Sequence, residues 1–226
     1  PGALQALVAA VGARGDMTSQ STAVLMAIAR ADCQMAQRVA EAPGALAALV
    51  AALAGGCDEA SNCAVALQTI AEAEAGLAQR VAETPEALPA LVAAVAAGGD
   101  AAAHCLAALG CVASADSQLT RLVAEVPGAL PALVAAVAAG SGDVASAAGH
   151  VLAVIRSWAE AVVAAARTKC GHCGRNADEA AAARLRVCEC CKTARFCDAE
   201  CQRHAWRGHK MACRVIAATR GGNAGA

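Results

Sequence analysis

A segment that recurs every 42 residues constrains the fold of this chain more than any other feature of its sequence. The four copies read PGALQALVAAV, PGALAALVAAL, PEALPALVAAV and PGALPALVAAV, and they begin at Pro1, Pro43, Pro85 and Pro127. A fixed period of this length is typical of repeat architectures, in which one unit cannot bury its apolar face alone. The sequence therefore predicts an array of stacked repeats with a continuous core.

Each repeat is predicted to form three helical pieces. The apolar side chains of the first piece have i, i+3, i+4, i+7 spacing, which places them in one stripe on a helix. In the third repeat this stripe consists of Leu88, Leu91, Val92 and Val95. A glycine pair ends this helix, and Asp100 is expected to cap a second helix over 101–113. A third helix is expected over 118–126, where Pro127 closes it.

The composition agrees with packed helices and predicts no membrane span. Apolar residues make up 58% of the chain but aromatic residues only 1%, so the core is expected to consist mainly of Ala, Val and Leu. Small side chains let helices approach closely, and Ala has the highest helix propensity. The longest uncharged stretch, 126–142, has 17 residues and contains two prolines, so it is not expected to cross a bilayer.

A three-helix repeat of this period with a Leu-Pro-Ala-Leu-Val opening resembles the armadillo repeat. The resemblance covers residues 1–166, with repeats that start near 1, 43, 85 and 127, and it implies a right-handed superhelix. Peptide-binding armadillo proteins carry an Asn near the end of the long helix, whereas this chain has no amide at the equivalent positions. Those positions are Ala27, Thr69, Cys111 and Val154. The array is therefore expected to act as a spacer or as a shape-complementary docking surface.

The C-terminal part carries eight metal-ligating side chains with the pattern C-x2-C-x14-C-x2-C-x5-C-x3-C-x7-H-x3-C. They are Cys170, Cys173, Cys188, Cys191, Cys197, Cys201, His209 and Cys213. Two CxxC pairs and two i, i+4 pairs would complete two tetrahedral zinc sites, although spacing alone permits either partnering. A segment with so few aromatic residues needs this metal to fold, because structural zinc contributes about 10–16 kcal/mol of apparent binding free energy. Thiolate ligands also require a reducing, cytoplasmic or nuclear compartment.

Residues 170–213 resemble a MYND zinc finger, through the run Cys191-Lys-Thr-Ala-Arg-Phe-Cys197 and the residues that follow it. The resemblance implies interleaved sites. One zinc would be held by Cys170, Cys173, Cys197 and Cys201, and the other by Cys188, Cys191, His209 and Cys213. The loop 174–187 is longer than usual for this family, and its Ala-rich insert over 177–184 is expected to form a helical turn or an irregular excursion.

The same resemblance implies a function in protein recognition. MYND fingers bind short Pro-rich PxLxP-like segments, which lose little entropy when they dock in an extended form. The matching groove residues are Gln202, as a polar contact to the peptide backbone, and Trp206, as an apolar platform. Trp206 could instead pack only on the zinc core. No enzymatic activity is expected, because two closed zinc sites leave no open position for a reacting group.

Charge is divided unevenly along the chain and bears on an alternative function. Residues 1–166 carry 6 Arg and 14 acidic residues, whereas residues 167–226 carry 12 Lys and Arg and 5 acidic residues. The alternative is therefore a nucleic-acid-associated regulatory protein that uses the basic face of the zinc module. Its candidate contacts are Arg184, Arg186, Arg195, Arg203, Arg207 and Lys210. We expect nucleic-acid binding to be the lesser possibility, because two zinc ions on seven thiolates leave only a mildly basic segment.

These inferences define an all-α chain in three parts. The repeat array is expected over 1–166, the two-zinc MYND finger over 167–214 and a disordered tail over 215–226. The predicted protein is a monomeric, zinc-binding adaptor for protein partners with Pro-rich motifs.

Overall fold

The computed structural model describes residues 2–13, 18–56, 60–140, 142–176 and 185–221. Its contacts divide the chain into two compact units, Pro1–Val151 and Leu152–Ala226. The boundary falls within one helix, α11 (Asp143–Val163), whereas the sequence placed the division after residue 166. The insert expected over 177–184 lies outside the described residues.

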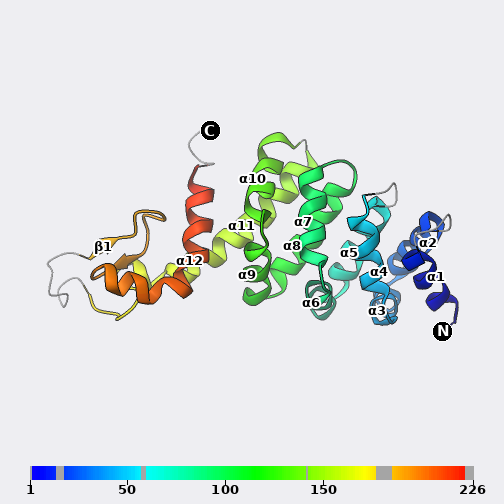
Figure 1. Cartoon of the computed structure of the whole chain (residues 1–226), viewed down its shortest axis with the longest axis horizontal. Coiled ribbons are helices and arrows are strands. Elements are labelled where there is room, and N and C mark those ends of the chain that lie inside the picture. The colour runs from blue at the N-terminus through cyan, green and yellow to red at the C-terminus, as the bar shows by residue number, and fades with distance from the viewer. Residues whose placement is uncertain (1, 14–17, 57–59, 141, 177–184, 222–226) are drawn as a thin grey trace. The chain divides into compact units, whose positions relative to one another are not determined.

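Helices in the first unit come in sets of three, as the repeat predicts (Figure 1). The first repeat contains α1 (Gly2–Ala13), α2 (Thr18–Ala31) and α3 (Cys33–Glu41). The second contains α4 (Ala45–Ala54), α5 (Ala60–Ala73) and α6 (Ala75–Glu83). The third contains α7 (Ala87–Ala97), α8 (Ala101–Ala115) and α9 (Ser117–Glu125), and α10 (Ala129–Ala139) and α11 follow.

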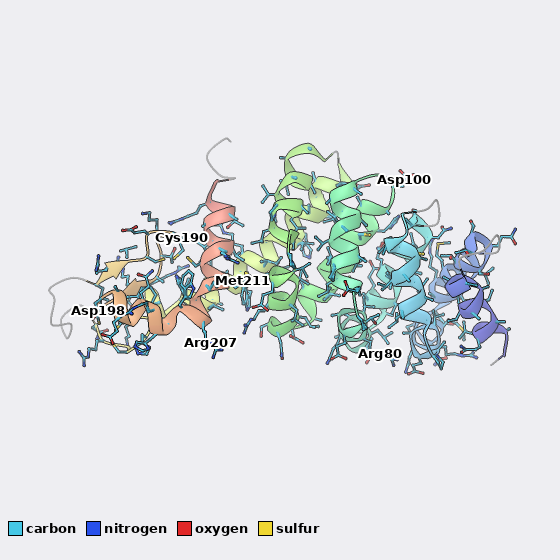
Figure 2. The ribbon with its side chains drawn as sticks, in the orientation of Figure 1. Arg80, Asp100, Cys190, Asp198, Arg207 and Met211 are labelled. Carbon is cyan, nitrogen blue, oxygen red and sulfur yellow. The ribbon has the colours of Figure 1, made fainter. Side chains whose placement is uncertain are left out.

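Helices at equivalent places in successive repeats pack against one another. The second helices form one row, in which α5 contacts both α2 and α8, and the first helices form another, in which α4 contacts both α1 and α7. The predicted stripe on α7 is confirmed, because its four side chains are between 0% and 7% exposed. Arg80 on α6 also links neighbouring repeats, since its Nη2 donates to the carbonyl oxygen of Ala40 at 3.0 Å (Figure 2).

The helix starts follow the sequence, but one predicted cap does not form. Asp116 has extended backbone and accepts from the N–H groups of Gln118 and Leu119, so it caps α9. Asp100 precedes α8 as predicted, yet its own backbone is helical, with φ −66°, and its side chain accepts no capping bond. A capping side chain reaches the next N–H groups only from a non-helical backbone, so the prediction for Asp100 is wrong.

The turns before α4, α7 and α10 each place one residue in the left-handed region. Gly44 has φ 78° and Gly128 has φ 84°, and between them Glu86 occupies the same place in the third repeat with φ 63°. Glycine adopts this conformation without steric cost, whereas a residue with a Cβ is strained there. The third repeat therefore contains a local strain that its neighbours avoid.

The second unit is built around short pieces of secondary structure. After α11 come a 3-10 turn, η1 (Ala165–Arg167), two short strands, β1 (Arg186–Val187) and β2 (Arg195–Phe196), and the helix α12 (Ala199–Gly221). The strands are antiparallel and pair Arg186 with Phe196. Phe196 is only 1% exposed and is the largest fully buried side chain described, so the small core of this unit forms around it.

The prediction of a disordered tail from residue 215 is wrong for 215–221, because α12 continues through Gly221. Val215 is fully buried and Ile216 is 6% exposed, so apolar burial extends the helix beyond its last metal ligand. Residues 222–226 lie outside the described part of the chain.

Among the described residues, no single helix is long and apolar enough to cross a membrane. Helices α9 and α10, which are bent by 86° at their junction, have sufficient length and apolar composition only when taken together.

Candidate metal centre

The second unit brings the eight predicted ligands together as two groups of four. The first group contains Cys170, Cys173, Cys197 and Cys201, and the second contains Cys188, Cys191, His209 and Cys213. Within each group the potential ligand atoms all lie within 4.8 Å of one another. Spacing alone left two partnerings open, and the observed grouping is the interleaved one that the resemblance implies.

Each group draws its ligands from two kinds of local structure. The CxxC pairs lie in turns, the first after η1 and the second between β1 and β2, and they supply two sulfurs each. The other two ligands of the first group are Cys197, just before α12, and Cys201, near its start, whereas those of the second group lie in the middle of α12. His209 and Cys213 are one helical turn apart on α12, so both face the same point.

The distances fit tetrahedral zinc. Tetrahedral bonds of about 2.3 Å hold two sulfurs about 3.8 Å apart. The Sγ atoms of Cys173 and Cys197 are 3.6 Å apart, and those of Cys188 and Cys213 are 3.7 Å apart. His209 presents Nε2, which lies 3.7 Å from Sγ of Cys191. A disulfide would instead need about 2.05 Å between sulfurs.

Hydrogen bonds and burial prepare these side chains for a cation. Burial opposes ionisation of Cys170, but N–H donors from the backbone of Cys173, His172 and Cys197 outweigh it and lower the pKa of this thiol to about 6. Partial burial, followed by the sulfurs of Cys173 and Cys170, raises the pKa of Cys197 to about 11. The sulfur of Cys170 is thus held as an anion, whereas that of Cys197 resists ionisation beside it. A bound divalent cation would stabilise both sulfurs as thiolates.

The second group shows the same division in a more enclosed setting. All four of its residues are buried, whereas Cys173 in the first group is exposed. Burial opposes ionisation of Cys188, but backbone N–H donors from Cys191 and Cys190 lower its pKa. Burial lowers the pKa of His209, which keeps the imidazole neutral, the form that binds zinc. The donor set and its geometry therefore fit two structural zinc ions.

The two CxxC turns have the same backbone design. In the first, the N–H of Gly174 donates to the carbonyl oxygen of Cys170 at 3.0 Å, and in the second, the N–H of Lys192 donates to that of Cys188 at 2.9 Å. Both donors have left-handed backbone, with φ 75° at Gly174 and 53° at Lys192. This conformation turns the chain so that both sulfurs of a pair face one metal ion.

The two predicted peptide-binding residues lie together on α12. Ala199, Gln202, Arg203 and Trp206 line a shallow concavity of about 370 Å³. Trp206 is 41% exposed, and its ring also meets the ring of His209 edge-on at a centroid distance of 6.0 Å. Gln202 donates from Nε2 to Sγ of Cys188 at 3.7 Å. Both residues therefore contact the second metal group as well as the surface.

Sequence reasoning missed several supporting residues. Asp198, labelled in Figure 2, caps α12 by accepting from the N–H of Cys201 at 2.8 Å, and this bond lowers the pKa of Asp198. An Asp three residues before a ligand at a helix start is a recognisable capping signal. His172 and His204 stack with ring centroids 5.0 Å apart, which no local spacing indicates. Cys190, the eighth thiol of this segment, is exposed.

Residues 170–213 match the family model of the MYND finger. The chain is also similar in structure to a designed armadillo repeat protein, YIII(Dq)4CqI, with a TM-score of 0.60 and 20% identity over 92% of this chain and 99% of that chain. A designed armadillo repeat protein in complex with the peptide (KR)4 has a TM-score of 0.62 and 18% identity, over 97% of this chain and 99% of that chain. At this level of identity the likeness shows the fold alone. No curated protein matches the chain.

The comparisons and the geometry agree on the organisation of the molecule. Armadillo-like helical repeats are followed by a C-terminal MYND finger that holds two structural zinc ions. The MYND finger is a protein-interaction module.

Proposed function

We propose that this chain is an adaptor whose MYND finger binds short Pro-rich, PxLxP-like segments of partner proteins. The observation that carries the proposal is the concavity on α12, where Trp206 stays 41% exposed although the zinc core lies directly beneath it. A large apolar ring half in solvent gains from a partner that covers it. An extended, proline-stiffened segment suits a shallow groove, because little conformational entropy is lost when it binds.

Gln202 supplies the polar side of this groove. Its Nε2 donates to the sulfur of Cys188, and this bond fixes the orientation of the amide. The Oε1 atom is then free to accept a hydrogen bond from a peptide N–H. Proline has no N–H, so the donors in a PxLxP-like segment are its intervening residues and its leucine. The leucine side chain would then rest against Trp206.

Zinc acts here by holding the groove together. Each metal group has four protein ligands, so neither offers the open position that metal-assisted catalysis needs. We therefore propose a non-enzymatic role. Reduced thiolates in both groups agree with a cytoplasmic or nuclear location, and we propose a monomeric adaptor in that setting.

The repeat array is proposed to be a spacer or a shape-complementary docking surface. In the designed protein that was solved with (KR)4, an array binds a peptide. The present array has its own concavity of about 560 Å³, which includes Glu72, Cys111, Asp143 and His150 among its lining residues. Two carboxylates there would favour a basic partner over an acidic one.

The groove is tested with a fluorescent PALAP peptide and the zinc-loaded full chain. Trp206→Ala should weaken binding by at least about tenfold, as is usual for a buried aromatic anchor. Trp158→Ala removes the other indole and serves as the control, with affinity expected to stay within about twofold. Both variants should still contain two zinc ions per chain, and unchanged peptide affinity in Trp206→Ala would refute the groove assignment.

A further inference from the structure

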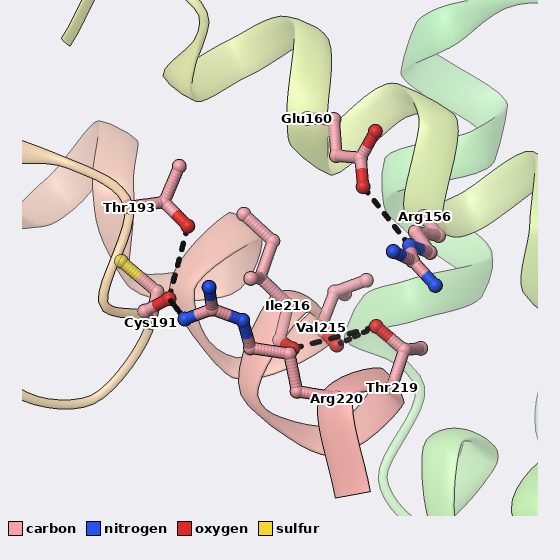
Figure 3. A network of polar contacts seen from close by, with 8 residues as sticks. All are labelled: Arg156, Glu160, Cys191, Thr193, Val215, Ile216, Thr219 and Arg220. Carbon is pink, nitrogen blue, oxygen red and sulfur yellow. Dashed lines mark hydrogen bonds and ion pairs between the residues drawn. The ribbon is translucent and has the colours of Figure 1, made fainter. Parts of the chain in front are cut away.

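The second unit contains a basic pocket that is separate from the groove on α12. This basic pocket has a volume of about 380 Å³ and lies among α11, η1, the second CxxC turn, β2 and the C-terminal part of α12. Figure 3 draws Arg156, Glu160, Thr193 and Arg220 among its lining residues. Five cations line it, Arg156, Arg167, Lys192, Arg195 and Arg220, against one carboxylate, Glu160. Cationic side chains from four separate stretches of sequence thus lie together in one concavity.

Some of these charges are already engaged. Nε of Arg156 lies 2.9 Å from Oε1 of Glu160, and Nη1 of Arg220 donates to the carbonyl oxygen of Cys191 (Figure 3). In contrast, no side-chain hydrogen bond or ion pair to any described residue is observed for Arg167, Lys192 or Arg195. Three uncompensated cations in one pocket repel one another, and a bound anion would relieve that repulsion.

The backbone at Lys192 provides a second, independent observation. Lys192 occupies the left-handed position that Gly174 occupies in the first CxxC turn, and glycine would satisfy that position without strain. The turn alone therefore does not require a lysine side chain. A strained residue that carries a charge into a pocket is typical of a functional site.

The lining also indicates the class of anion. Arginine forks and a lysine ammonium match the oxygens of a phosphate group, and the hydroxyls of Thr193 and Thr219 lie at the same pocket. None of the described residues that line the pocket is aromatic, whereas single-stranded nucleic acids usually need rings on which bases stack. We propose that the basic pocket binds the phosphate group of a phosphorylated serine or threonine side chain on a protein partner.

This site would give the adaptor a second, modification-dependent contact. It does not depend on the Pro-rich groove, because the two concavities share no lining residue. A partner would be held at the basic pocket only after phosphorylation, since the neutral hydroxyl lacks the charge that the cations need.

Nuclear magnetic resonance of the zinc-loaded, ¹⁵N-labelled full chain tests the proposal. The probe is N-acetyl-O-phosphoserine N-methylamide, and the control ligand is the same compound without phosphate. We expect saturable shifts of the amide signals of Lys192, Thr193 and Thr219 with the phosphorylated compound and none with its unphosphorylated control. Inorganic phosphate should shift the same signals with equal or weaker affinity.

Variants that change the charge of the pocket should change its affinity for the phosphorylated compound in opposite directions. Lys192→Gly and Arg195→Ala should each weaken binding by about fivefold or more, because each removes a charge-assisted contact. Glu160→Gln removes the one carboxylate among the described lining residues and should strengthen binding by about twofold. Arg207→Ala makes the same charge change outside the pocket and should leave the affinity within about twofold.

Several outcomes would overturn the proposal. Tighter binding of inorganic phosphate would indicate a site for the free anion. Tighter binding of a twelve-nucleotide oligothymidine through the same signals would indicate nucleic acid instead. Shifts that fail to saturate, or an equal loss of affinity in Arg207→Ala, would indicate general attraction to a basic surface. Zinc content is measured in every variant, so that a loss of metal is distinguished from a loss of anion binding.

Discussion

The amide of Gln202 donates to the sulfur of Cys188, with Nε2 and Sγ 3.7 Å apart. A residue whose predicted role was to contact peptide backbone therefore also supports a metal ligand. Donors to a ligating sulfur orient it and stabilise its charge, and the loss of such partners commonly weakens metal binding. The groove and the second metal group are linked through this side chain.

Substitution of Gln202 should consequently affect both properties. We expect Gln202→Ala to weaken zinc binding at the second group by about tenfold and to weaken PALAP binding as well. Zinc release to a competing chromogenic chelator measures the first effect. Trp206→Ala is the matched comparison, because its zinc release should be close to that of the unaltered chain. Equal release from Gln202→Ala and the unaltered chain would contradict a supporting role.

Relief of the strained turn in the third repeat should stabilise the array. Glu86→Gly places glycine where Gly44 and Gly128 already stand in the neighbouring repeats, and we expect a gain of about 0.5–1 kcal/mol in the free energy of unfolding. Urea denaturation followed by circular dichroism measures this change. The reverse variant, Gly44→Ala, should destabilise the array although its Cβ would meet no atom within 4 Å, because the cost comes from the backbone. A loss of stability in Glu86→Gly would show that the glutamate side chain contributes more than its strained backbone costs.

Removal of zinc should unfold the finger and leave the array folded. Structural zinc supplies the folding free energy of a segment whose core has one Phe, whereas the repeats bury their own Leu, Val and Ala side chains. Hydrogen exchange after chelation is expected to show lost protection over 185–216 and retained protection in α5 and α8. Loss of protection in α5 and α8 would mean that the array depends on the metal.

The non-ligand cysteines should differ sharply in reactivity. Cys105 is fully buried, and burial, followed by the neighbouring Cys63, raises its pKa to about 12. It stays a protonated thiol at pH 8, and the thiolate is the reactive form. We expect iodoacetamide to label the exposed Cys33 and Cys190 in the native, zinc-loaded chain, and to reach Cys105 only after denaturation. Mass spectrometry of quenched samples identifies the labelled sites, and rapid native labelling of Cys105 would contradict its burial.

Much of the fold follows from local sequence. The 42-residue period, the apolar stripe and the closing prolines depend on residues only a few positions apart, so they predict three helices per repeat without knowledge of the whole. The failed cap at Asp100 shows the limit of such reasoning. Capping needs a particular backbone conformation, and the preceding glycine turn leaves Asp100 in a helical one.

The identities of the eight metal ligands were likewise determined by the sequence, because chelation by CxxC and by i, i+4 pairs is a local property. The tertiary structure decided how those pairs combine, since either partnering satisfies the spacing. It also decided that α12 continues past Cys213, that Gln202 contacts a metal ligand and that five cations meet in the basic pocket. These features join residues far apart along the chain, and only the packing of α11, the CxxC turns and α12 within their unit brings them together.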